Sequence, residues 1–526
     1  MNIKQRLISG FTIVEVTVVI FIIGILAAIT YISYDGIQKR VIDVSVDSDV
    51  QRIASLELNY KTNNGSTALA YYSGGGTDSG LGFTPKTGNL IDVVIKNSDY
   101  CVRGYNPAGN KDTIYNSSIK ESTSGICSQI APSPIPIAGY SGPKLWTKVS
   151  ASYNDTCAVA TDNNAYCWGM GNFGQLGNNA TVGSTVPVAV STAGVLSGKT
   201  IKSISTGNNN SCVIASDNKA YCWGANWYGG LGNNTTTDSS VPVAVNTSGV
   251  LSGKTIKSIT VGAYHTCAVA SDNLAYCWGH GNSGQLGNNT IVDSLVPVAV
   301  NTAGVLSGKT VLSLSAGVQD TCAVASDNLA YCWGSNQYGI LGDGTNNLSS
   351  VPVAANTSGV LSGKTINSIT ASYYHSCVIA SDNQVYCWGS NWYGELGNNS
   401  TADSWVPVAT STTGALSGKT VISIANSTFD TCAIASDFKV YCWGGADYGQ
   451  LGNSTFTQSN VPVVVSNTSN FTNQSIISIS ATDSIHACAL AFDNNIYCWG
   501  SNIYGELGNG STTNSNIPVQ SKPALY

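Results

Sequence analysis

A sequence unit repeated seven times from Trp146 onward constrains this chain more than any other feature. Its marker, Tyr-Cys-Trp-Gly, recurs at intervals of 55 residues five times and then of 56, and each marker is followed by Gly-x-Leu-Gly and a Pro-Val step. Tandem copies of one supersecondary unit bury their apolar faces by packing on one another. The marker cysteines are Cys167, Cys222, Cys277, Cys332, Cys387, Cys442 and Cys498.

Each unit contains four short segments with the composition of β-strands. In the third copy they are Ile256–Thr260, Cys267–Ala270, Ala275–Trp278 and Val296–Ala299. A single four-stranded sheet cannot cover both of its faces, whereas a closed ring of such sheets removes most exposed edges. We therefore predict a mainly β fold, with a seven-bladed β-propeller over residues 146–526.

The repeat resembles the regulator-of-chromosome-condensation repeat, whose hallmark is a Trp-Gly step followed by Gly-Gln-Leu-Gly, here Gly174–Gly177 in the first copy. The resemblance covers residues 146–526 and implies the propeller fold. It does not imply an activity, because propellers carry unrelated functions. We expect no nucleic-acid partner, since the net charge is -6 and no basic stripe is visible.

A second cysteine precedes each marker cysteine by ten residues. The intervening residues predict a strand, an Asp-Asn turn and a strand, and pairing about Asp272 would place Cys267 opposite Cys277. Non-hydrogen-bonded neighbours lie about 4.5 Å apart between Cα atoms, within disulfide reach. We predict one cross-strand disulfide in each blade; bridges between blades and free packed thiols are alternatives, and a zinc site is disfavoured by the spacing. The pairs are Cys157-Cys167, Cys212-Cys222, Cys267-Cys277, Cys322-Cys332, Cys377-Cys387, Cys432-Cys442 and Cys488-Cys498.

The N-terminus combines a short basic leader, residues 1–10, with a long apolar run from Phe11 to Tyr34 whose one charge is Glu15. About 20 apolar residues span a bilayer, and the positive leader is expected to stay cytoplasmic. The motif from Gly10 to Glu15 resembles the processing site of type IV prepilins. A plain membrane anchor is the alternative.

The prepilin resemblance implies cleavage after Gly10 by a prepilin peptidase and N-methylation of Phe11. It also implies an assembly role for Glu15. Without a partner, a carboxylate at membrane depth costs about 2.5–3.5 kcal/mol, and in pilins its partner is the terminal amine of a neighbouring subunit. We expect a single-pass precursor in the bacterial cytoplasmic membrane with its C-terminus outside, and later a place in a pilus at the cell surface. Other pilin subunits and the assembly machinery are the expected partners.

Three further regions precede the propeller. Residues 11–60 contain no proline and predict a long pilin helix. Residues 61–131 predict a small α+β pilin-like head with strands at Leu90–Ile95 and from Asp99 to Val102. Within it, Cys101 and Cys127 resemble the disulfide loop of pilins. Residues 132–145 are rich in proline and predict a semi-rigid linker.

No constellation in the sequence predicts an enzyme, and we expect no catalytic residue, metal or cofactor. There is no Gly-x-Ser-x-Gly elbow and no phosphate-cradling loop with a lysine. His265, His375 and His486 share one repeat position, where the other copies have Asp or Asn. Such a position is expected to form hydrogen bonds in a turn or loop.

Two variable repeat positions predict a binding surface. The residue before a nearly constant tyrosine varies widely and is Trp227 and Trp392 in two copies; the residues before the His/Asp position include Tyr264, Tyr373 and Tyr374. Exposed aromatic residues on loops dominate binding hot spots; neutral drift among copies is the alternative. We interpret the chain as a minor or tip pilin whose propeller binds a cell-surface protein or glycan. A structural pilin or a secretion-system pseudopilin is the rival interpretation.

Overall fold

The computed structural model describes side chains for residues 144–466, 471 and 474–524, and the backbone of five strands between residues 71 and 123. The chain divides into two compact units, Met1–Ile137 and Ala138–Tyr526, which we describe separately.

In the first unit the five strands form one antiparallel sheet in chain order. The strands predicted at Leu90–Ile95 and from Asp99 to Val102 are present and extend slightly further, as β2 and β3. The strands are β1 (Tyr71–Gly74), β2 (Leu90–Lys96), β3 (Asp99–Tyr105), β4 (Asp112–Asn116) and β5 (Glu121–Thr123).

The other predictions for the N-terminal part lie outside the described residues. They are the leader, the helix over residues 11–60, the disulfide to Cys127 and most of the proline-rich linker. Among the residues that are described, no helix is long and apolar enough to cross a membrane.

The second unit contains seven four-stranded antiparallel sheets, each made of consecutive strands. In the third blade these are β14 (Ile256–Val261), β15 (His265–Ala270), β16 (Ala275–Gly279) and β17 (Ser294–Ala299), which confirms the four predicted strands. Short 3-10 turns occur at Gly194–Leu196, Gln337–Gly339 and Gly414–Leu416. The other blades are β6 (Trp146–Ala151), β7 (Asp155–Ala160), β8 (Ala165–Gly169) and β9 (Ser184–Ala189); β10 (Ile201–Thr206), β11 (Asn210–Ala215), β12 (Ala220–Gly224) and β13 (Ser239–Ala244); β18 (Val311–Ala316), β19 (Asp320–Ala325), β20 (Ala330–Gly334) and β21 (Ser349–Ala354); β22 (Ile366–Ala371), β23 (His375–Ala380), β24 (Val385–Gly389) and β25 (Ser404–Ala409); β26 (Val421–Asn426), β27 (Asp430–Ala435), β28 (Val440–Gly444) and β29 (Ser459–Val464); and β30 (Ile476–Ser480), β31 (His486–Ala491), β32 (Ile496–Gly500) and β33 (Ser515–Gln520).

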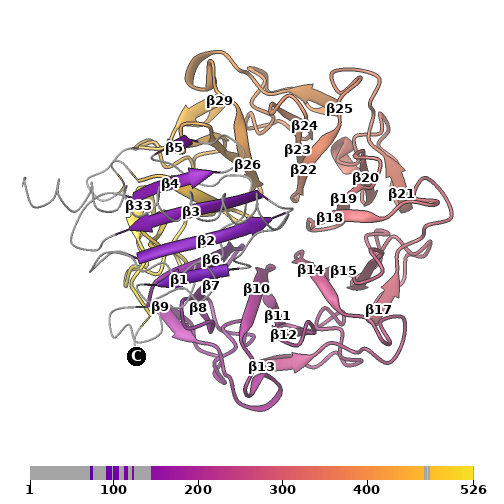
Figure 1. Cartoon of the computed structure of the whole chain (residues 1–526). Helices are drawn as coiled ribbons and strands as arrows, with labels where there is room; N and C mark the ends of the chain where they lie inside the picture. Colours follow the sequence, from indigo (N-terminus) through magenta and orange to yellow (C-terminus); the bar gives the residue numbers. More distant parts are fainter. Residues whose placement is uncertain are drawn as a thin grey trace, which may run out of the picture. The chain divides into compact units, whose positions relative to one another are not determined.

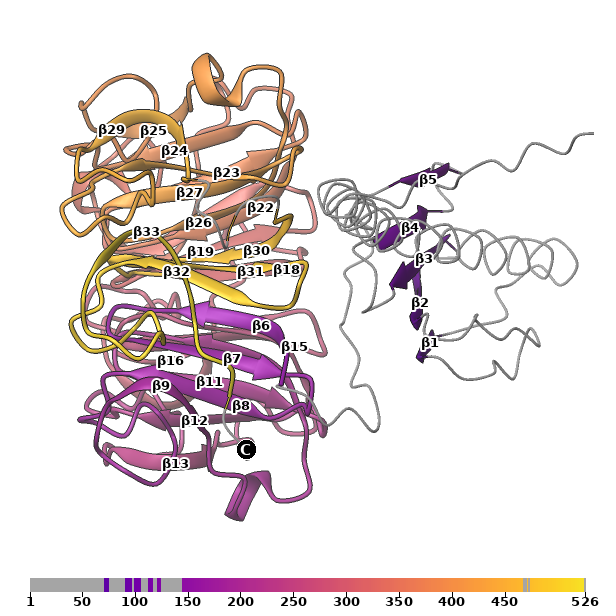
Figure 2. The ribbon, with the colours of Figure 1, turned by 90° about the vertical axis from the view of Figure 1, so that its left-hand side faces the viewer.

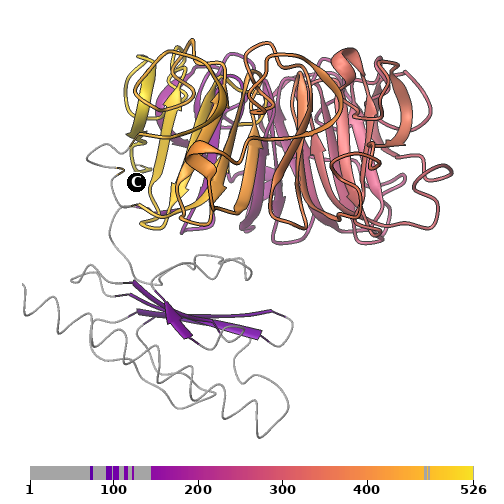
Figure 3. The same ribbon diagram turned by 90° about the horizontal axis from the view of Figure 1, so that it is seen from above.

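The blades form a ring, with the first strand of each blade nearest the axis and the fourth at the rim (Figure 1). Because consecutive strands run in opposite directions, the loops between strands 1 and 2 and between strands 3 and 4 lie on one face of the propeller. The turns between strands 2 and 3 and the loops that lead to the next blade lie on the other face. Figures 2 and 3 show the propeller from the side, with the strands running between these two faces.

The two repeated motifs meet at every blade boundary. The indole Nε1–H of each marker tryptophan donates a hydrogen bond to the backbone carbonyl of the variable residue in the Gly-x-Leu-Gly motif of the preceding blade, over 2.7–2.9 Å. The last glycine of that motif packs against the same ring. At Gly287, which has φ +64°, an added Cβ would lie 2.6 Å from Nε1 of Trp333. The motifs therefore recur because each blade needs both halves of this contact.

The ring closes between the first and last blades by the same contact. Nε1 of Trp168 lies 2.7 Å from the carbonyl oxygen of Glu506, and Lys144 pairs with Ala524 in an antiparallel bridge. The one interval of 56 residues comes from an extra residue between β30 and β31. Asp483 in this loop has φ 46° and is buried.

Every blade has the predicted disulfide between its second and third strands. In the third blade Cys267 lies directly opposite Cys277, and in all seven pairs the Cα atoms are 4.0–4.1 Å apart. The described part of the propeller contains no free cysteine. The alternatives of bridges between blades and of free thiols were therefore wrong for these residues.

Candidate binding surface

The structure places all five predicted contact residues on one face of the propeller. Tyr264, Tyr373 and Tyr374 lie in loops between strands 1 and 2, and Trp227 and Trp392 lie in loops between strands 3 and 4. Trp227, Tyr373 and Trp392 are 45%, 40% and 48% exposed, whereas Tyr264 and Tyr374 are half-buried. We call this face the aromatic face.

Three of the predicted residues form one continuous cluster over blades 4 to 6. Tyr374 is in its middle, with its ring centroid 4.1 Å from that of Tyr373 and 5.9 Å from that of Trp392. Tyr338 of blade 4 packs edge-on against Trp392 at 4.9 Å, and Phe429 of blade 6 stacks on Tyr374 at 5.7 Å. Because these rings brace one another across blade boundaries, the cluster is a preformed surface. We call it the blade 4–6 cluster.

The other two predicted residues belong to a smaller group over blades 1 to 3. Phe173 packs edge-on against Trp227 at 4.8 Å, and Tyr228 contacts Tyr264 at 5.8 Å. His280 lies against the ring of Tyr228 and close to the carboxylate of Asp293, with 2.9 Å between Nδ1 and Oδ1.

Two small pockets occupy equivalent positions in these groups, two blades apart. Seven of the eight positions that line one pocket have their counterpart in the other, 110 residues along the chain. The predicted residues were therefore brought together in pairs, Trp227 with Tyr264 and Tyr373 with Tyr374. The linings are Asn209, Asn210, Ala225, Trp227, Tyr228, Gly230, Ala263 and Tyr264, and Val318, Gln319, Ser335, Gln337, Tyr338, Ile340, Tyr373 and Tyr374.

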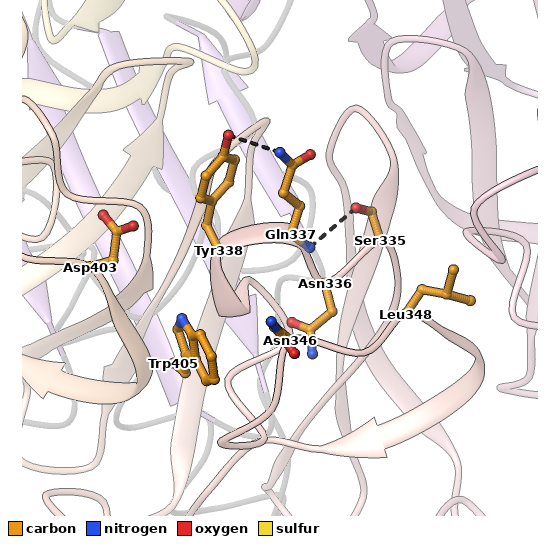
Figure 4. Close-up of a pocket in the computed structure, with 8 residues that line it drawn as sticks. All are labelled: Ser335, Asn336, Gln337, Tyr338, Asn346, Leu348, Asp403 and Trp405. Carbon is orange, nitrogen blue, oxygen red and sulfur yellow. Dashed lines mark hydrogen bonds between the residues drawn. The ribbon is translucent and has the colours of Figure 1, made fainter.

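A larger open pocket of about 510 Å³ adjoins the blade 4–6 cluster (Figure 4). Tyr338 and Gln337 of blade 4 line it together with Asp403 and Trp405 of blade 5, and the Gln337 amide donates a 2.8 Å hydrogen bond to the Tyr338 hydroxyl. Tyr338 has φ 69°, a conformation that is costly for a bulky residue and that concentrates at functional positions.

Trp405 was missed from the sequence, although it is 44% exposed. Its ring packs against Gly339, where an added Cβ would lie 2.5 Å from the ring. It is the only tryptophan at its repeat position, at the start of the fourth strand. The other copies have Thr185, Ser240, Leu295, Ser350, Asn460 and Asn516 there, so a comparison of the copies at this position would have found it.

The opposite face carries a repeated arrangement of ion pairs. In the third blade Nζ of Lys254 lies 3.1 Å from Oδ2 of Asp272 and 4.7 Å from the ring centroid of Tyr276, whose hydroxyl donates to the same carboxylate over 2.6 Å. Blades 1 to 6 all have this lysine–aspartate–tyrosine group. Blade 7 keeps the tyrosine–aspartate bond but has Gln474 in place of the lysine.

The three repeated histidines hold neighbouring blades together. Nε2 of His265 lies 2.8 Å from the hydroxyl of Thr321 in the next blade, and this hydroxyl donates to the carbonyl of Gln285. His375 and His486 make the same contact with Thr431 and Thr156. Burial lowers the pKa of each histidine to about 3, so the rings are neutral. The described residues contain no group of three or more potential metal ligands.

Buried carboxyl groups lie beneath the aromatic face at two blade boundaries. Burial, and secondarily the neighbouring charge of Glu395, raises the pKa of Asp430 to about 8, and burial raises the pKa of Glu395 to about 7. Glu506 and Asp155 form the second such pair, and burial likewise raises the pKa of Glu506 to about 7. These four side chains are buried, so they are not exposed to a ligand.

Comparison with known proteins agrees with this geometry. The family model described as "Regulator of chromosome condensation (RCC1) repeat" matches residues 162–214, 217–269, 272–324, 327–379, 382–434, 439–489 and 493–524. The chain belongs to this family. The matches confirm the resemblance of the repeats and extend to every blade of the ring.

Individual relatives of this RCC1-repeat protein share the propeller region. The ultraviolet-B receptor UVR8 of Arabidopsis thaliana is 29% identical over 371 residues, which cover 70% of this chain and 80% of the receptor. The human E3 ubiquitin-protein ligase HERC2 is 27% identical over 322 residues, 60% of this chain but 6% of the ligase. Among solved structures, Prp20p of Saccharomyces cerevisiae has a TM-score of 0.59 at 18% identity, with 72% of this chain and 87% of Prp20p covered.

Proposed function

We propose that this RCC1-repeat protein is a type IV pilin-like surface protein, a minor or tip subunit whose propeller is a binding module for adhesion rather than an enzyme. The aromatic face is the observation that carries the binding role. The residues that hold the blades together are nearly constant among the seven copies, whereas exposed aromatic rings gather in the loops of one face, over blades 4 to 6 above all. Exposed, braced aromatic side chains are typical binding anchors.

The pilin part of the proposal is supported by the motif from Gly10 to Glu15 and the apolar run that follows it. It gives the bacterial cytoplasmic membrane and then the pilus surface as the location. N-terminal sequencing of the mature protein tests it directly. We expect the sequence to begin at Phe11 with a methylated amine; an intact Met1 in the mature protein would contradict it.

The position in the filament separates the proposal from a purely structural role. The chain enters the propeller at Lys144, at the end of the blades opposite the aromatic face. Immunogold labelling with antibodies against the propeller is expected to mark filament tips. Continuous labelling along the shaft would favour a structural pilin.

Binding itself is tested with the whole protein on candidate target cells. The repeats provide substitutions that the scaffold already accepts, because Asn172 and Asn282 occupy the position of Trp392, and Ala263 occupies that of Tyr373. We expect Trp392→Asn combined with Tyr373→Ala to abolish adhesion while the melting temperature stays unchanged. Unchanged adhesion would remove the blade 4–6 cluster from the proposal.

A further inference from the structure

The two ends of the propeller differ in their lysine and arginine content. Within the described propeller, no lysine or arginine occurs in a loop between strands 1 and 2 or between strands 3 and 4. The lysines lie in the segments that lead into each blade, in the turns between strands 2 and 3, in the first strands and just beyond the last strand. The loops of the aromatic face contain eight acidic residues: Asp238, Asp293, Asp343, Glu395, Asp403, Asp447, Asp483 and Glu506.

Several of these carboxylates are accessible beside the aromatic rings. Asp403 is exposed and lines the open pocket with Trp405 and Tyr338, and Asp447 is exposed in the loop of blade 6. A surface that carries carboxylates and no lysine or arginine repels phosphate, sulfate and carboxylate ligands, and it attracts cations. The charge of this face therefore selects for a positively charged partner.

The aromatic rings offer the second half of such a site. The face of a tryptophan or tyrosine ring attracts ammonium and guanidinium groups. All the cation–π contacts found within the described propeller use tyrosines of the opposite face, each with a lysine of its own blade. Tyr373, Trp392 and Trp405 are 40–48% exposed and have no such cation.

We propose that the blade 4–6 cluster, together with the adjoining open pocket that Trp405 lines, binds a segment of a partner protein that carries lysine and arginine side chains. Trp392 and Tyr373 provide ring faces for the guanidinium or ammonium groups, and Asp403 and Asp447 provide the opposite charge at the margin. This inference rests on the proposed binding function and narrows its ligand to a cationic protein segment. A neutral glycan is the competing ligand.

The experiment uses the purified full chain in mild detergent, with its disulfides intact, and three labelled probes: a ten-residue oligoarginine peptide, a ten-residue oligoglutamate peptide and dextran. We expect oligoarginine to bind, the other two not to bind, and the affinity to fall between about 50 and 300 mM salt, since screening weakens exposed charge pairs. Preferential binding of dextran, insensitive to salt, would overturn the proposal in favour of a neutral glycan.

Variants distinguish a specific binding site from non-specific attraction by net charge. Trp392→Asn and Asp403→Asn are each expected to weaken oligoarginine binding at least tenfold. The matched control is Ile503→Asn, because Ile503 occupies the position of Trp392 in blade 7 and is 53% exposed without an aromatic ring. Its affinity is expected to stay unchanged. Equal affinities of the wild type and the Trp392→Asn variant would overturn the site.

The outcome is distinguishable from failure of the proposed function. If adhesion to target cells depends on Trp392 but oligoarginine does not bind, the adhesive role stands and the cationic partner is wrong. If oligoarginine binds through Trp392 but the mature N-terminus is Met1, the site stands and the pilin role is wrong.

Discussion

The last glycine of each Gly-x-Leu-Gly motif shows how a single missing side chain sets the spacing between blades. At Gly287 the backbone has φ +64°, and the indole of Trp333 occupies the space that a Cβ would need. Trp333 can then reach the carbonyl of Gln285 over 2.9 Å. A larger residue would therefore strain the backbone and separate two blades.

Gly287→Ala is expected to destabilise the protein by about 2–4 kcal/mol, because overpacking and a strained backbone act together. The midpoint of guanidinium unfolding measures the change. Gly304→Ala is the control, since nothing lies within 4 Å of its added Cβ, and it is expected to stay within about 0.5 kcal/mol of the wild type. Equal midpoints for the two variants would contradict this account of the motif.

The buried glutamates predict a loss of stability at alkaline pH. The pKa of Glu395 and of Glu506 is raised to about 7 in the folded protein, above the value in the unfolded chain. The folded protein therefore binds more protons than the unfolded chain. The contribution of these groups to the free energy of unfolding is complete below pH 4.5 and is lost as the pH rises through 7. We expect the melting temperature to fall between pH 5.5 and pH 8.5.

The repeats supply the control for this pH dependence. Gln175, Gln285 and Gln450 occupy the position of Glu395 and Glu506 in other blades, so Glu395→Gln with Glu506→Gln keeps the fold. The melting temperature of the double variant is expected to fall less over the same pH interval. An identical loss would show that other groups cause it.

At the scale of the element, the sequence identified the strands well because each blade repeats the same pattern. The first strand is irregular, since a register shift between Ile256 and Ser258 against β15 interrupts the alternation of inward and outward side chains. The cross-strand cysteine pairs could be predicted because pairing about the central residue of the turn, Asp272 in the third blade, determines which residues face each other. The extra residue of blade 7 was visible in the sequence as the interval of 56 residues. The burial of Asp483 could not be predicted from that interval.

The binding surface was predictable only in part. Trp227, Tyr264, Tyr373, Tyr374 and Trp392 were found because the copies differ at their positions. Trp405 was missed, since its contacts with Gly339 and with the pocket beside Tyr338 cross a blade boundary. The pattern within one repeat does not predict such contacts, whereas a comparison of the seven copies at this position distinguishes Trp405.

Removal of one disulfide is expected to cost a blade about 2–3 kcal/mol, the entropy of closing an 11-residue loop in the unfolded chain. Replacement of Cys322 and Cys332 by alanine, followed by guanidinium unfolding, measures it. Mass spectrometry after alkylation without reductant is the accompanying check on the wild type. Alkylated cysteines in the folded propeller would contradict the pairing.

At the scale of the whole molecule, the ring is expected to open first at its weakest boundary. Most blades add a hydroxyl donor to the tryptophan contact, as Thr321 does toward the carbonyl of Gln285. Blade 7 has Ala487 at this position, so its boundary with blade 6 retains Trp499 as donor to Gln450 but has no hydroxyl.

Ala487→Ser is expected to restore the missing donor and stabilise the ring by about 1 kcal/mol, a rise in melting temperature of about 1–2 °C. In blade 2, Ser211 occupies the position of Ala487 and hydrogen-bonds to Asp155 of blade 1. A serine beside an aspartate at a blade boundary therefore has a precedent in this chain. Ala487→Val adds bulk without a hydroxyl and is expected to give no gain. Hydrogen exchange at the boundary of blades 6 and 7 should slow in the serine variant alone.

The cross-strand disulfides also limit how far the molecule can lengthen under tension. In the proposed role as a pilus subunit, force transmitted along the backbone would enter the ring at Lys144, beside the first inner strand. Each disulfide, such as Cys157–Cys167, joins the two strands of a hairpin. A blade pulled from the ring therefore extends by less than the full contour length of its residues. Stretching single molecules with and without reductant would reveal this limit as two different gains in contour length per unfolded blade.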